Sequence, residues 1–128
     1  MEPNRSGQRW NIVRSARDAY SGAWRALRRT RSLQLGLAAS VAAIVVGRLL
    51  GLSLVELLLI VLAATLLMAV EIMNTAIELL CDFVHAAPHP AIGRIKDIAA
   101  GATACCEVGA AVVLVVLYGD RIWHLLGH

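Results

Sequence analysis

Residues 54–82 read LVELLLIVLAATLLMAVEIMNTAIELLCD. Its apolar part, residues 54–80, exceeds the ~20 residues that an α-helix needs to cross a bilayer. At ~1.5 Å per residue this helix is about 40 Å long, whereas the hydrocarbon core is about 30 Å thick. The stretch therefore predicts a transmembrane helix with one end projecting into the headgroup region.

The composition of the whole chain agrees with a membrane protein. Over 128 residues, 59% are hydrophobic, 16% are charged, and the mean hydropathy is +0.69. Such a balance excludes an ordinary soluble domain, and the length leaves room for a single unit. Two more apolar stretches, residues 33–50 and 98–118, are long enough to cross the bilayer. We therefore predict an all-α integral membrane protein, one domain over residues 1–128, with three transmembrane helices.

The connections between these stretches predict how the helices follow one another. A tight turn is expected around Gly51, Leu52 and Ser53, which makes the first two helices an antiparallel hairpin. The second connection, residues 83–96, is polar and carries two prolines that break a continuous helix.

The segment before the first span is rich in arginine. Residues 8–31 place apolar and aromatic side chains at helical spacing between these arginines, which predicts an amphipathic helix on the membrane surface. The excess of positive charge predicts a cytoplasmic N-terminus. Such a helix either anchors the chain to anionic lipid or covers a site at the same interface. The arginines are Arg5, Arg9, Arg14, Arg17, Arg25, Arg28, Arg29 and Arg31.

Four polar residues form one stripe on the long second span. Glu71, Asn74, Glu78 and Asp82 recur at helical spacing, and a carboxylate within a membrane is costly enough to indicate a functional site. The alternative is that the stripe only bonds neighbouring helices or subunits. Glu78 and Asp82, near the interface, suit a divalent cation that bridges phosphate oxygens. The deeper Glu71 suits a proton acceptor for a hydroxyl group presented from the lipid.

Basic residues in the second connection suit a polyanion at this membrane face. Arg94 and Lys96 lie beside Asp97 and could contact nucleotide phosphates, although no glycine-rich phosphate loop occurs in the sequence. The three cysteines fit small packing residues within apolar helices. A metal site between His85 and His89 is not favoured, because the proline between them interrupts a shared helical face.

Two sequence segments carry a family resemblance over nearly the whole chain. Residues 71–78, EIMNTAIE, and residues 89–102, HPAIGRIKDIAAGA, resemble the signature of the prokaryotic diacylglycerol kinase and undecaprenol kinase family. The resemblance implies a homotrimer in the bacterial inner membrane that uses ATP and Mg²⁺ to phosphorylate a lipid hydroxyl. It implies that Glu71 is the catalytic base and that Glu78 binds the metal. The implied nucleotide-binding residues are Asn74, Lys96, Asp97 and, as a weaker match, His89.

Two positions depart from what the family pattern leads us to expect. The family carries a second metal-binding glutamate just before the first span, where this chain has Thr30, a poorer Mg²⁺ ligand. Glu107 stands in the third span where an apolar residue is expected, at a depth similar to that of Glu71. The predicted function is an ATP-dependent lipid kinase acting on diacylglycerol or undecaprenol. The alternative is a non-catalytic or altered trimer that binds lipid or partner proteins.

Overall fold

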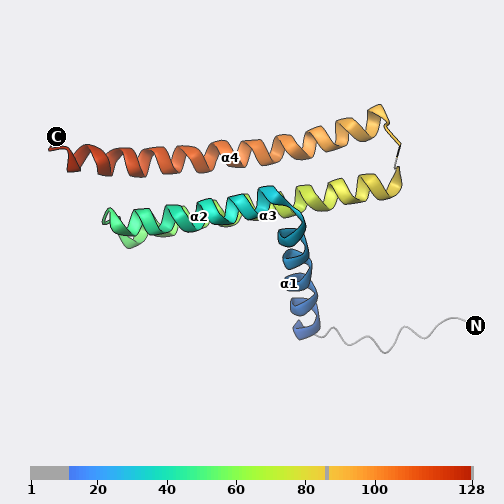
Figure 1. Ribbon diagram of the computed structural model, residues 1–128, viewed down its shortest axis with the longest axis horizontal. Coiled ribbons are helices and arrows are strands. Elements are labelled where there is room, and N and C mark those ends of the chain that lie inside the picture. Colours follow the sequence, from blue (N-terminus) through green and yellow to red (C-terminus); the bar gives the residue numbers. More distant parts are fainter. Residues whose placement is uncertain (1–11, 86, 128) are drawn as a thin grey trace, which may run out of the picture.

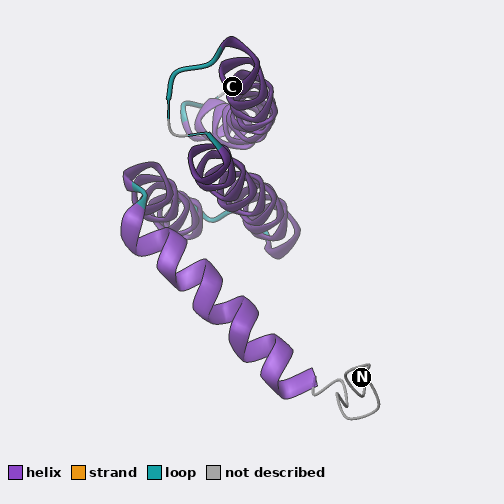
Figure 2. Ribbon diagram, turned by 90° about the vertical axis from the view of Figure 1, so that its right-hand side faces the viewer, coloured by secondary structure: helices purple, strands orange, loops and turns teal. Residues whose placement is uncertain are grey.

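The structure is a computed structural model that describes residues 12–85 and 87–127. Within these residues the chain forms only helices: α1 (Ile12–Arg29), α2 (Arg31–Leu49), α3 (Leu54–Val84) and α4 (Pro90–Leu125) (Figure 1). Helices α2, α3 and α4 are long and apolar enough to cross a membrane. They run side by side, with α3 between α2 and α4, while α1 leaves this bundle at a steep angle (Figure 2). The predicted all-α class and the three long apolar helices are confirmed.

The connection from α2 to α3 is the tight turn that the sequence predicts. Gly51 has a φ of +76°, which an L side chain rarely adopts, and Leu52 is buried beneath the turn. Ser53 then caps α3: its hydroxyl accepts from the Glu56 backbone N–H, and the Glu56 carboxylate accepts from the Ser53 N–H at 2.6 Å. This capping box fixes where the long helix begins.

Thr30 separates α1 from α2. It adopts an extended backbone conformation between the two helices, and its side chain makes no capping hydrogen bond. The last carbonyl groups of α1 are instead satisfied by Gln34, whose amide donates to the oxygens of Leu27 and Arg28. The expected helix over residues 8–31 is thus shorter, because this break ends it at Arg29; residues 8–11 lie outside the described part. Its position on a membrane surface stays a prediction.

The connection between α3 and α4 is shorter than the sequence suggests. Helix α3 continues to Val84, and α4 starts at Pro90 rather than at the expected residue 98. Proline fits the first helical turn, where its missing N–H would have no partner, and the His89 ring accepts from the Ala91 N–H at 3.2 Å. The proline that was expected to break a helix therefore begins one, and it places Lys96 and Asp97 on α4.

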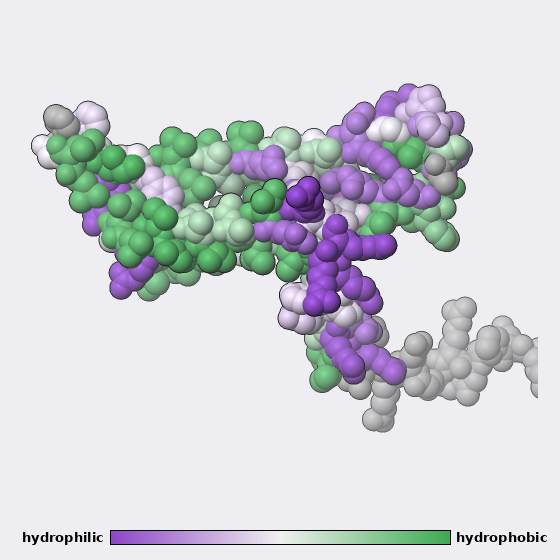
Figure 3. Space-filling view, viewed as in Figure 1, coloured by the Kyte–Doolittle hydropathy of each residue, from purple (hydrophilic) through white to green (hydrophobic). Residues whose placement is uncertain are grey.

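We call the end of the bundle that holds the α2–α3 turn the turn end, and the part that runs from the start of α2, where α1 joins partway along α3, to the α3–α4 connection the site end (Figure 1). At the turn end, Tyr118 of α4 donates to the Ala43 carbonyl of α2, and the Arg121 guanidinium donates to the Leu50 carbonyl at 2.7 Å. Hydrophilic residues gather along α1 and at the site end of α3 and α4, whereas the sides of the bundle are largely apolar (Figure 3). This distribution suits helices surrounded by lipid.

Candidate functional site

Glu71 lies on the inner side of α3, at the level where α2 begins. Its side chain is only 9% exposed, and its carboxylate accepts a hydrogen bond from the Ser32 hydroxyl at 3.2 Å. Ser32 stands in the first turn of α2, so the break at Thr30 brings its hydroxyl to α3. A buried carboxylate with one neutral donor retains lone pairs that can take a proton.

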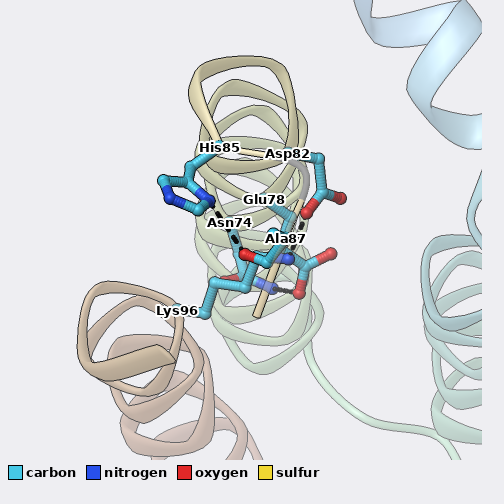
Figure 4. A network of polar contacts seen from close by, with 6 residues as sticks. All are labelled: Asn74, Glu78, Asp82, His85, Ala87 and Lys96. Atoms are coloured by element: carbon cyan, nitrogen blue, oxygen red, sulfur yellow. Dashed lines mark hydrogen bonds and ion pairs between the residues drawn. The ribbon is translucent and has the colours of Figure 1, made fainter. Parts of the chain in front are cut away.

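Asn74 and Glu78 lie one and two turns from Glu71 toward the site end. The Asn74 amide donates to one oxygen of the Glu78 carboxylate at 3.2 Å, as Figure 4 shows. This bond orients an exposed carboxylate, and the carbonyl oxygen of Asn74 is buried without a partner among the described residues. The pair therefore presents acceptor oxygens and no positive charge.

Asp82 completes the polar stripe and joins α3 to α4. Its carboxylate lies 2.5 Å from the Lys96 ammonium, which reaches across from the second turn of α4 (Figure 4). The sequence did not predict this ion pair, because helical spacing within α3 says nothing about its partner on α4. The pair fixes the lysine at the site end of the bundle.

The loop between α3 and α4 forms a cavity of about 620 Å³ beside this ion pair. Its lining includes Asp82 and Lys96 together with His85 and His89, whose ring centroids lie 5.2 Å apart. Within the described ranges 12–85 and 87–127, no three His, Cys, Asp or Glu side chains are grouped closely enough to hold a metal ion by themselves. Asp97 is exposed and lines neither this loop cavity nor the one described next.

A second cavity, of about 780 Å³, lies where α1 and the start of α2 meet α3; we call it the α1–α3 cavity. Thr30 and Glu78 both line it. Asp82 lines both cavities. The remaining polar residues of the lining are Arg25, Arg29, Arg31 and Thr75.

The side chains around Glu78 fit a cation that is shared with phosphate. Mg²⁺ is usually bound by one or two carboxylates and completed by phosphate oxygens and water. Glu78 and Asp82 line the same cavity, and Asn74 holds one oxygen of Glu78 in place. The Thr30 hydroxyl carries no charge, so the described residues suit a phosphate-bridged ion rather than a site built from protein ligands alone.

Sequence reasoning missed two residues of the site. Thr75 stands four residues after Glu71, so helical spacing could have placed it on the same side of α3. Ser32 carries no comparable signal, because its hydrogen bond to Glu71 joins residues 39 apart. Glu107 is exposed, while the described contact of Glu71 goes to α2. No hydrogen bond joins the two acids among the described residues.

Comparison with known proteins places this arrangement in a family. The sequence model described as prokaryotic diacylglycerol kinase matches residues 17–118, a range that includes every predicted site residue and Thr30. The chain belongs to the prokaryotic diacylglycerol kinase family. An undecaprenol kinase of Bacillus subtilis (strain 168) is 32% identical to this family member over 104 residues, which are 81% of this chain and 85% of the relative. The resemblance carried by the two sequence segments is thus confirmed.

Proposed function

We propose that this chain is an ATP-dependent lipid kinase that transfers the γ-phosphoryl group to the hydroxyl of diacylglycerol or undecaprenol. Family membership and the undecaprenol kinase relative support a lipid kinase. The observation that carries the assignment is the buried Glu71 carboxylate, which lies on α3 two helical turns from Glu78. Such a carboxylate, buried within an apolar bundle, suits a base for a membrane alcohol.

In this proposal Glu71 takes the proton of the lipid hydroxyl. The hydroxyl oxygen forms a bond to the γ-phosphorus, the bond from that phosphorus to the bridging oxygen breaks, and ADP leaves. Ser32 is a positioning residue, because its hydroxyl holds one oxygen of the Glu71 carboxylate at 3.2 Å. The products are ADP and a lipid phosphate.

The nucleotide contacts are proposed for residues at the site ends of α3 and α4. Asn74, Lys96, Asp97 and His89 are the candidates, and the loop cavity beside Lys96 offers space for a phosphate chain. Glu78 is the proposed ligand of Mg²⁺. When bound, this ion would neutralise charge on the phosphate oxygens.

We further propose a homotrimer in the bacterial inner membrane, with the N-terminus and residues 85–89 in the cytoplasm. Family membership supports the assembly, and the exposed Glu107 supports a subunit contact, because a carboxylate facing lipid is costly. The arginine-rich N-terminal segment supports the orientation. Labelling of Ala87→Cys by an impermeant thiol reagent from outside intact cells would contradict this orientation.

The function is tested with the purified chain in mixed micelles containing diacylglycerol or undecaprenol, Mg²⁺ and ATP labelled at the γ-phosphate. We expect label in one lipid fraction and none when Mg²⁺ is chelated. Thr30 is the one feature that favours the alternative, a trimer that binds lipid or partners without catalysis. Absence of labelled lipid both in the native chain and in Thr30→Glu would favour that alternative.

A further inference from the structure

The α1–α3 cavity contains positive charge that the proposed roles leave unused. Arg25 and Arg29 of α1 and Arg31 of α2 all contribute to its lining. Among residues 12–85 and 87–127, no carboxylate forms an ion pair with any of these three guanidinium groups. Of the two acids in the lining, Asp82 already pairs with Lys96. The cavity therefore has a surplus of cationic donors.

Thr75 provides a second and independent observation. Thr75 is 8% exposed and lines the same cavity, and its hydroxyl has no hydrogen-bond partner among the described residues. Other helical threonines of this chain satisfy the hydroxyl on their own helix: Thr65 donates to the Val61 carbonyl at 2.7 Å and Thr103 to the Ala99 carbonyl. A buried hydroxyl without a partner costs free energy, so this donor is free for a group that enters the cavity.

We propose that the α1–α3 cavity is a binding site for a phosphate group, with Arg29 and Arg31 contacting its oxygens and the Thr75 hydroxyl donating to it. Guanidinium groups bind phosphate through paired N–H donors, and a neutral hydroxyl adds a donor without repulsion. Ile72 and Leu79 line the same cavity and suit the first carbons of a lipid. The phosphate belongs either to the lipid product or to the nucleotide, an identity that rests on the proposed kinase function.

The neutral side chain of Thr30 suits a phosphate site in this cavity. A carboxylate at this position would place a negative charge beside the arginines and oppose a phosphate in the absence of metal. The neutral hydroxyl leaves the cationic lining available. Arginine side chains thus neutralise part of the phosphate charge. With a second carboxylate ligand, a bound metal ion would neutralise that part instead.

The test measures binding without metal or turnover. The full chain, in detergent micelles with EDTA, is titrated separately with three probes, and the heat of binding is recorded. Two probes carry phosphate: dihexanoyl phosphatidic acid and a non-hydrolysable ATP analogue. The third, dihexanoylglycerol, lacks phosphate. We expect at least one phosphate-bearing probe to bind, and we expect dihexanoylglycerol not to compete with that probe for the cavity. Preference for phosphatidic acid identifies the lipid phosphate as the ligand, and preference for the analogue identifies the nucleotide.

Matched variants locate the binding. Arg29→Gln and Arg31→Gln should each weaken it about tenfold or more, as expected for loss of a charge-assisted hydrogen bond. Thr75→Val should weaken it less, and Thr30→Glu should also weaken it. Arg28→Gln is the control, because Arg28 lies on the same helix over the Trp24 ring and outside the cavity lining. Arg29→Lys, which keeps the charge, should retain part of the affinity, and circular dichroism checks the fold of each variant.

Two results would overturn the inference. An equal loss in Arg28→Gln and Arg29→Gln would mean that arginines attract anions generally, without a site. Failure of both phosphate probes to bind the native chain would mean that the cavity serves another purpose. Failure of the kinase proposal is distinguishable, because it is seen as absent lipid phosphorylation while metal-free phosphate binding persists.

Discussion

The two ends of the bundle differ in how many of their polar groups have partners within the chain. At the turn end, the Ser53–Glu56 capping box is complete, Arg121 donates to the Leu50 carbonyl, and Tyr118 donates to the Ala43 carbonyl. At the site end, Thr75 and the Asn74 carbonyl oxygen are buried without a partner, and three arginines of the cavity lack an ion pair among the described residues.

The difference separates a structural end from a ligand-binding end. Polar groups that satisfy one another stabilise the helices, and little is gained by adding a ligand there. Unsatisfied donors and acceptors around a cavity are costly in the free chain and become favourable only when something binds. Substitutions at the turn end should therefore change stability, and substitutions at the site end should change activity or binding.

The largest effect is expected at Glu71. Glu71→Gln keeps the shape of the side chain but cannot accept the hydroxyl proton, so lipid phosphorylation should fall by about 10²- to 10⁴-fold. Nucleotide binding should persist. Glu107→Gln is the matched control, since this acid lines neither cavity. Near-normal turnover of Glu71→Gln in the labelled-ATP assay would show that another group is the base.

Gly47 tests the structural end. A Cβ atom at this buried position would lie 2.9 Å from Leu52 and 3.3 Å from the Tyr118 hydroxyl. Gly47→Ala should lower the free energy of unfolding by about 1–3 kcal/mol, as overpacking does. Activity per folded molecule should stay near native.

Gly109→Ala is the control for Gly47→Ala, because, beyond the backbone of its own helix and its chain neighbours, no described residue would lie within 4 Å of its added Cβ atom. Unfolding of both variants in mixed micelles, followed by circular dichroism, compares them. Equal unfolding curves would contradict the close packing described for the turn end.

Lys96 should affect binding more than stability. Its ion pair with Asp82 is solvent-accessible, and such pairs contribute little to folding. We therefore expect Lys96→Gln to weaken nucleotide binding about tenfold while the unfolding midpoint is unchanged. Arg94→Gln removes the same charge from α4 outside both cavities and should bind normally. If Lys96→Gln instead lowers the unfolding midpoint and leaves nucleotide affinity unchanged, Lys96 stabilises the fold and does not bind nucleotide.

The smallest effect is expected at Thr30. Thr30→Glu adds a carboxylate to the cavity that Glu78 lines, so the Mg²⁺ concentration for half-maximal lipid phosphorylation should fall about fivefold. Thr30→Gln is the control for the change in volume, because glutamine is similar in size to glutamate but carries no charge. The same Mg²⁺ dependence in all three proteins would indicate that the arginines already supply the neutralisation.

Much of the fold follows from the sequence because helical spans depend on local composition. Apolar length predicted α2, α3 and α4, and Gly51 predicted the turn between the first two. The boundaries were less accurate where capping decides them. Pro90 begins α4 because its missing N–H is harmless there, and Thr30 ends the preceding helix despite continuous helical spacing.

Helical periodicity of 3.6 residues was enough to predict which residues share a side of α3, and residues 71–78 and 89–102 were enough to identify the family. The partners of these residues became visible only in the folded chain. Ser32 meets Glu71, Lys96 meets Asp82, and three arginines come to line the same cavity as Thr75. Each of these contacts depends on the axial offset and rotation of one helix against another. Hydropathy does not fix those two quantities, because every rotation of an apolar helix presents similar side chains to lipid.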